Sequence, residues 1–175
     1  MPAAATRFKG LVYRAHNPQW AWAPLSGEGA RRFGGRFNAP GTPALYTALT
    51  PLGAIREASP LGRPMQPLTL CAYAVETEAL FDATDPAALA GEGVGQAALD
   101  CPNWNREMLD GRVPASQALA TRLAVAGYAA MRVQSYARGA EPGEENIVFW
   151  NWGEDRPARV VLIDDDRRLP TQPPG

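Results

Sequence analysis

The residues best suited to chemistry gather in the first third of the chain. Arg14 ends a short apolar run, and Arg36 follows two glycines in the segment Gly-Gly-Arg-Phe-Asn at 34–38. Glycines let a backbone approach a ligand closely, and an arginine can hold a phosphate through a fork of charge-assisted hydrogen bonds. Tyr46 and Glu57 add an aromatic ring and a carboxylate further along. The combination predicts a small anionic ligand bound by this third of the chain.

Each of these residues also has a plainer interpretation when it is taken singly. Most exposed arginines are only solvated, and a tyrosine such as Tyr46 is often part of a core. Glu57 lies beside the apolar stripe of a predicted helix, where a solvated glutamate is common. Ser135 ends one predicted strand and Asn146 precedes another, so both suit turns. The local sequence therefore leaves both interpretations open.

The charge of the chain is distributed unevenly. Residues 1–60 carry seven Lys+Arg and two Asp+Glu, a net charge of +5, whereas residues 61–175 carry ten and sixteen, a net charge of −6. The overall net charge of −1 and the isoelectric point near 5.9 argue against a general nucleic-acid binder. We therefore expect the basic third to bind a small anion and no nucleic acid.

The scarcity of histidine and cysteine excludes several kinds of site. His16 is the only histidine, and Cys71 and Cys101 are thirty positions apart with no CxxC motif. A Cys/His zinc site and a two-histidine metal site both need more ligands than this, and a Ser–His or Cys–His mechanism has a single candidate base. Neither a strand-turn-helix GxGxxG nor a GxxxxGK[ST] loop is present. We expect no metal and two free thiols.

Length and composition indicate one domain over residues 1–165, followed by a disordered, Pro-rich tail over 166–175. Apolar residues make up 46% of the chain, which is ordinary for a globular protein. No apolar run approaches the ~18 residues of a membrane span, and the N-terminal residues lack an apolar signal core. We therefore expect a cytoplasmic protein without a membrane segment.

The predicted elements that must position these residues are short. We expect helices over 51–58, 82–90 and 114–126, of which the first begins with Thr50 as its cap and Pro51 at the first helical position. The stretch 15–43 is expected to be a long ordered loop, and 91–111 a connection without a clear period. Strands are expected at 11–14, 44–47, 68–75, 128–134, 147–152 and 159–163.

Two of these elements also carry burial predictions. The 68–75 strand is apolar nearly throughout and is expected to be buried on both faces. The 114–126 helix is expected to bury the stripe Ala118, Leu119, Leu123 and Ala126. Because strands and helices do not alternate regularly, the sequence favours an α+β fold with mixed, mostly antiparallel sheets flanked by short helices.

The order and spacing of four segments resemble one family, the RES domain. These segments are Val-Tyr-Arg-Ala-His at 12–16, Gly-Gly-Arg-Phe-Asn at 34–38, the run from Ala44 to Glu57, and the pair Met-Arg-Val-Gln-Ser-Tyr-Ala and Glu-Asn-Ile-Val-Phe-Trp between 131 and 150. The family is named after an arginine, a glutamate and a serine. The matching residues are Arg14, Glu57 and Ser135, with Arg36 and Tyr46 at further positions of the pattern.

This resemblance spans residues 11–163 and implies an ADP-ribosyltransferase-like fold with NAD⁺ as the substrate. It also implies a toxin of a toxin–antitoxin system, which breaks the nicotinamide–ribose bond and is neutralised by an Xre-like antitoxin that occludes the active site in a hetero-oligomer. Phe37 departs mildly from the pattern, because a tryptophan is common at that position.

The resemblance assigns the site residues to parts of NAD⁺. Arg14 and Arg36 would bind the pyrophosphate, and the ring of Tyr46 would face the cationic nicotinamide. Glu57 would stabilise the positive charge that develops on the ribose, with Ser135 bonding to the ribose or positioning Glu57. Nicotinamide leaves as a neutral molecule, so no general acid is needed. The acceptor stays open between water, phosphate and a protein, and an inactive antitoxin-binding module is a further alternative.

Overall fold

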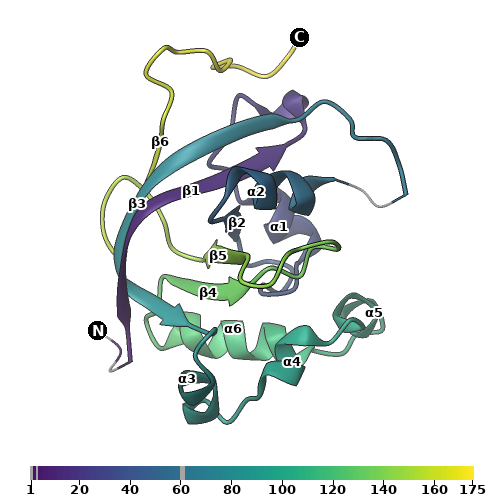
Figure 1. Cartoon of the computed structure of the whole chain (residues 1–175), viewed down its shortest axis with the longest axis vertical. Coiled ribbons are helices and arrows are strands. Elements are labelled where there is room, and N and C mark those ends of the chain that lie inside the picture. The colour runs from purple at the N-terminus through teal and green to yellow at the C-terminus, as the bar shows by residue number, and fades with distance from the viewer. Residues whose placement is uncertain (1, 3, 60–61) are drawn as a thin grey trace.

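The computed structural model describes residue 2 and residues 4–59 and 62–175. One six-stranded sheet forms the centre of the domain, in the order β1-β2-β5-β4-β3-β6 (Figure 1). An additional pairing of β1 with β3 closes five of these strands into a barrel, and β6 extends the free edge of β3. The strands are β1 (Thr6–His16), β2 (Leu45–Ala48), β3 (Thr69–Asp82), β4 (Ala130–Gln134), β5 (Glu145–Phe149) and β6 (Ala158–Leu162).

The predicted α+β class is confirmed, since this sheet is mixed and its helices are short. Among the strand pairings of the described residues, that of β3 with β4 is parallel and the others are antiparallel. A group of helices lies below β4 in Figure 1, while α2 lies above β5, beside β2 and beneath the arch of β1 and β3. The helices are η1 (Pro18–Trp20), α1 (Glu28–Phe33), α2 (Pro51–Ala58), α3 (Pro86–Gly91), α4 (Gln96–Asp100), α5 (Trp104–Leu109) and α6 (Ala115–Val125).

The two faces of the sheet bury two separate cores. On β5, Ile147 and Phe149 belong to a cluster that receives side chains from all six strands, and this cluster fills the barrel. The alternate residue Val148 packs instead with residues of α6, including Leu119 and Leu123, between the outer face of the sheet and the helices. This alternation follows from the two-residue period of a strand.

The structure confirms the predicted start of α2 to the residue. The Thr50 side chain accepts a hydrogen bond from the Gly53 N–H at 3.0 Å, and Pro51 occupies the first helical position. Asp85 likewise caps α3, which begins at Pro86 and not at 82 because β3 continues to Asp82. None of the helices in the described part of the chain is both long and apolar enough to cross a membrane.

Several predicted elements were wrong in extent or burial. The 68–75 strand runs over Thr69–Asp82 and buries alternate residues, because one side of most of its length faces solvent. The loop predicted at 15–43 contains the end of β1 and the helices η1 and α1, and the connection at 91–111 contains α4 and α5. Ala126 follows the last residue of α6 and is exposed, and the buried face of that helix includes Ser116, Leu119, Ala120 and Leu123.

Candidate active site

A cleft opens where β1 and β2 separate. The two strands form a single pair, Tyr13 with Ala48, and the residues that would pair next line the cleft instead. The cavity has a volume of about 250 Å³. It is lined by Tyr13, Arg14, Ala15, Tyr46, Thr47, Ala48, Ala54, Glu57, Ala58 and Asn146. Three of the five residues predicted from the sequence therefore share this cleft.

Glu57 lies on the last turn of α2 at the rim of the cleft, where its side chain is exposed. Two neutral donors converge on the same carboxylate oxygen. Ser135 Oγ donates to Glu57 Oε1 at 2.8 Å, and Asn146 Nδ2 donates to the same atom at 2.6 Å. Because both donors come from the β4–β5 hairpin, the carboxylate is oriented by a part of the chain about eighty residues away.

Helix α2 is held close enough to the sheet for this contact to form. A Cβ on Gly53 would lie 3.0 Å from Thr50 Oγ1 and 3.3 Å from the Ala48 side chain, so the absence of a side chain allows the close approach. At the other end, Arg56 forms an ion pair with Glu144, which belongs to the same hairpin as Ser135. The start of the helix therefore packs closely on β2, and its end is joined to the hairpin by an ion pair that does not involve the Glu57 side chain.

The Tyr46 side chain lines the cleft and holds the glycine-rich turn in place. Its hydroxyl donates to Asn38 Oδ1 at 2.7 Å and accepts from the Phe37 N–H at 3.0 Å. A Cβ on Gly35 would lie 2.4 Å from that hydroxyl, so the lack of a side chain at Gly35 leaves room for the Tyr46 hydroxyl. Burial raises the pKa of Tyr46, which keeps the phenol neutral.

Arg14 combines a place in the cleft with a structural contact. Its Nη1 donates to the carbonyl oxygens of Pro24 at 3.0 Å and Ser26 at 3.2 Å, which fastens the segment after η1 against β1. Burial lowers the pKa of the Arg14 guanidinium. A guanidinium has five N–H donors, so these two contacts do not exhaust its capacity to bind an anion.

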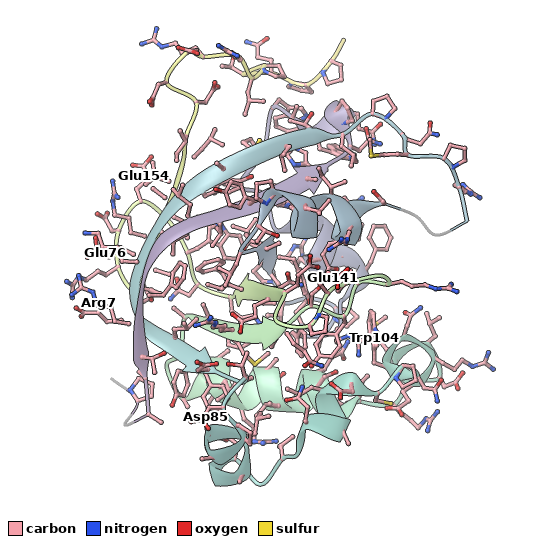
Figure 2. All side chains as sticks on the ribbon, in the orientation of Figure 1. Arg7, Glu76, Asp85, Trp104, Glu141 and Glu154 are labelled. Carbon is pink, nitrogen blue, oxygen red and sulfur yellow. The ribbon has the colours of Figure 1, made fainter. Side chains whose placement is uncertain are left out.

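Arg36 does not line the cleft that contains Glu57. Its Nη1 donates to the carbonyl oxygens of Leu99 at 2.8 Å, near the end of α4, and Cys101 at 2.9 Å, directly after that helix. The guanidinium also lies over two aromatic rings, 4.4 Å from the centroid of Tyr136 and 5.7 Å from that of Trp104. Figure 2 shows Trp104 on α5, beside the hairpin that carries Tyr136.

The charge of Arg36 nevertheless acts near the site. Burial lowers the pKa of its guanidinium, and the Glu57 carboxylate is among the groups whose charge opposes that effect. Arg36 is therefore within electrostatic range of Glu57 while its hydrogen bonds are directed to the helical segment. The structure brings Arg14, Tyr46, Glu57 and Ser135 together and places Arg36 at their side.

Sequence reasoning assigned Asn146 only to a turn, although its side chain contacts Glu57 directly. The available signal was its position, because Asn146 is a polar residue directly before the apolar residues 147–149 of β5. The sequence gives no sign that Tyr13 faces a cleft, because its pattern is that of one more residue of an apolar strand. Only the separation of β1 from β2 shows that both residues face a cleft.

A larger cavity of about 610 Å³ lies next to this cleft. The two cavities share Ala58, and the larger one begins at His16, two residues after Arg14 on β1. Burial, followed by the charge of Arg14, lowers the pKa of His16 to about 4, so its imidazole is neutral at pH 7. None of the five predicted site residues lines this larger cavity.

Fold and site together define an α+β barrel domain with one carboxylate presented at the rim of a cleft between an arginine and a tyrosine. The family model of the RES domain matches residues 11–172, nearly the whole chain. The chain belongs to the RES-domain family. A comparison with curated proteins finds no match.

Proposed function

We propose that this RES domain is an enzyme that consumes NAD⁺ by cleaving the nicotinamide–ribose bond, and that its fold is related to that of ADP-ribosyltransferases. The observation that carries the proposal is the Glu57 carboxylate, held by Ser135 and Asn146 at the rim of the cleft that also contains Arg14 and Tyr46. A single oriented carboxylate beside a cation-binding aromatic ring suits a cationic N-glycoside.

Glu57 would stabilise the transition state of this cleavage. When the C–N bond breaks, its electron pair leaves with nicotinamide, and positive charge develops on the ribose. A carboxylate beside that carbon stabilises the charge where it forms. The oxygen of water or phosphate then bonds to the same carbon, and for water the surplus proton passes to solvent. Because nicotinamide leaves neutral, the reaction is compatible with a cleft that contains no histidine among its lining residues.

The remaining residues would bind the rest of the dinucleotide. Arg14 would use its other N–H groups for the pyrophosphate, and Arg36 would add positive charge from beside the site. The Tyr46 ring would face the nicotinamide cation, an interaction worth about 0.5–2 kcal/mol. Ser135 would keep Glu57 oriented while the ribose binds.

We further propose that this activity arrests growth and that an Xre-like antitoxin neutralises it by covering the cleft. Glu57 is exposed at the rim, so a partner segment could reach the carboxylate and exclude NAD⁺ without unfolding the domain. The chain and its antitoxin would then form a hetero-oligomer in the cytoplasm. Expression without the partner should stop growth, and co-expression should restore it.

The decisive experiment mixes the purified chain with NAD⁺ in buffers with and without phosphate and identifies the products by mass. Nicotinamide with ADP-ribose would support a hydrolase, and nicotinamide with a phosphorylated ADP-ribose would support a phosphorylase. The Glu57→Gln variant is the control, because it keeps the side-chain volume and removes the charge. No loss of NAD⁺ in either buffer would contradict the proposal, and labelling of a lysate protein by ADP-ribose would then favour a transferase.

A further inference from the structure

We propose that Asn146 is a positioning residue that fixes the orientation of Glu57 for catalysis. This inference rests on the proposed cleavage of NAD⁺ and adds a residue to its machinery. The primary observation is the 2.6 Å hydrogen bond from Asn146 Nδ2 to Glu57 Oε1. Asn146 also lines the cleft, so its amide lies at the same site as the carboxylate that it holds.

The exposure of Glu57 shows that these donors are not needed for solvation. Water can satisfy an exposed carboxylate at little cost, and the net gain from one protein donor is small. Here two neutral donors, from Ser135 and Asn146, meet on Oε1. Their combined effect is directional, because they select one rotamer of a side chain that would otherwise sample several. The second oxygen, Oε2, is then left to face the ribose.

The surroundings of Asn146 favour a functional role over a purely structural one. Its register neighbours are Ala48 on β2 and Val133 on β4, both apolar, and the next three residues of β5 are buried. Asn146 Oδ1 is buried and has no hydrogen-bond partner among the described residues. A buried carbonyl oxygen without a partner destabilises a fold. A residue that costs stability and contacts the key carboxylate is better explained by function.

The chain offers a matched control for the alternative that Asn146 merely docks α2 on the hairpin. Arg56, the residue before Glu57, also joins α2 to this hairpin, through its ion pair with Glu144. Arg56→Gln weakens the docking of the helix without touching the Glu57 side chain. If docking were all that mattered, Arg56→Gln and Asn146→Ala would have the same consequences.

We expect Asn146→Ala to lower kcat for NAD⁺ cleavage by on the order of 10- to 100-fold, because a misplaced catalytic group costs that much. The KM for NAD⁺ should stay within about threefold, since binding is not the step affected. The melting temperature should not fall, because the unpartnered carbonyl is removed. Arg56→Gln should show the opposite pattern, a lower melting temperature with kcat within about threefold of wild type. Equal kcat losses in the two variants would overturn the inference.

Asn146→Asp gives a signature that a structural role would not produce. Two adjacent carboxylates share one proton, and the shared proton can replace the amide donor only until it dissociates. The kcat of this variant should therefore fall as pH rises, over a range in which wild-type kcat is constant. A pH profile parallel to that of the wild type would contradict the proposed role.

A measurement without substrate separates this inference from the proposed function. Side-chain ¹³C relaxation of Glu57 should show a rigid carboxylate in the wild type and a mobile one in Asn146→Ala. If the wild type cleaves no NAD⁺ but this change in mobility is observed, the proposed function fails and the positioning role stands. A Glu57 side chain that is equally mobile in both proteins would contradict the positioning role.

Discussion

Arg14 and Arg36 each place one guanidinium nitrogen between two backbone carbonyl oxygens, yet only Arg14 lines the cleft that contains Glu57. Arg14 fastens the segment after η1 to the barrel, and Arg36 fastens the end of α4. The sequence presents both as arginines suited to phosphate. Their surroundings differ. Arg14 faces the cleft, whereas Arg36 stacks on the rings of Tyr136 and Trp104.

The difference indicates that an arginine of the family pattern, such as Arg36, can contribute to a site by stabilising the segment beside it. A guanidinium over two rings with two carbonyl partners is fixed on several sides. Arg36 does not line the cleft, and its guanidinium lies over the rings of Tyr136 and Trp104. Arg14 can keep both of its carbonyl contacts and still offer other N–H groups to the cleft. Substitutions can test this contrast, first at the Glu57 carboxylate beside Arg14.

Glu57→Gln should have the largest effect, with a loss of kcat on the order of 100-fold or more, because charge stabilisation of the transition state is removed. Binding of NAD⁺ should change by less than about threefold, since the amide keeps an oxygen for Ser135 and Asn146. Nicotinamide release and calorimetric titration measure the two quantities. Turnover close to wild type would remove Glu57 from the mechanism.

Arg14→Ala should mainly weaken binding, raising the Kd for NAD⁺ by on the order of 10- to 100-fold, as expected for the loss of a charge-assisted hydrogen bond. Calorimetry on the inactive Glu57→Gln background measures this change without turnover. Arg14→Lys is the control, because it keeps the charge and loses the fork, and it should give an intermediate Kd. An unchanged affinity in Arg14→Ala would remove the contrast between the two arginines.

Arg36→Ala should mainly destabilise the fold, by about 1–3 kcal/mol, because two part-buried carbonyl oxygens lose their donor. Denaturant unfolding measures the free energy, and amide exchange should accelerate in α4 and α5. The increase in Kd for NAD⁺ should be smaller than that of Arg14→Ala. A larger increase, without loss of stability, would show that Arg36 contacts the substrate directly.

Tyr46→Phe should distinguish the contribution of the Tyr46 ring from that of its hydroxyl. We expect its effect on activity to be smaller than those of the preceding variants. The variant keeps the aromatic face in the cleft and loses the contacts with Asn38 Oδ1 and the Phe37 N–H. We expect a stability loss of about 1–3 kcal/mol and a KM within about threefold of wild type. Tyr46→Leu removes the ring as well and should raise the KM further. Equal KM values in these two variants would show that the ring does not bind substrate.

Local signals predicted the elements that carry the site, and contacts between distant parts of the chain were beyond them. Thr50 and Pro51 define the start of α2 because capping involves neighbouring residues. By contrast, α1 lacks a side-chain cap and has no buried residue, so it leaves no such pattern. The partners of Arg36 are backbone carbonyls, which no residue type identifies. Asn146 could be recognised as polar, but its contact with Glu57 depends on how the hairpin packs on α2.

The contrast between Arg14 and Arg36 can also be tested at His16, the only histidine of the chain, because the charge of Arg14 affects its pKa. The pKa of His16 is lowered to about 4, by burial first and by the charge of Arg14 second. Because the folded pKa lies below the unfolded value of about 6.5, the unfolded chain binds more protons between these limits. His16 therefore contributes a loss of stability as pH falls from about 6.5 to 4. Melting temperatures across this range should fall less in His16→Gln than in the wild type.

Titration of the His16 ring by NMR then compares the two arginines directly. Arg14→Gln should raise the pKa of His16 toward its ordinary value, because one of the two causes of the shift is removed while burial remains. Arg36→Gln should leave it unchanged, since Arg36 is not among the groups that shift it. Equal shifts of the His16 pKa in both variants would mean that the charges of both arginines act on His16. A shift in Arg14→Gln alone would show that the charge of Arg14, and not that of Arg36, reaches His16 at the start of the neighbouring cavity.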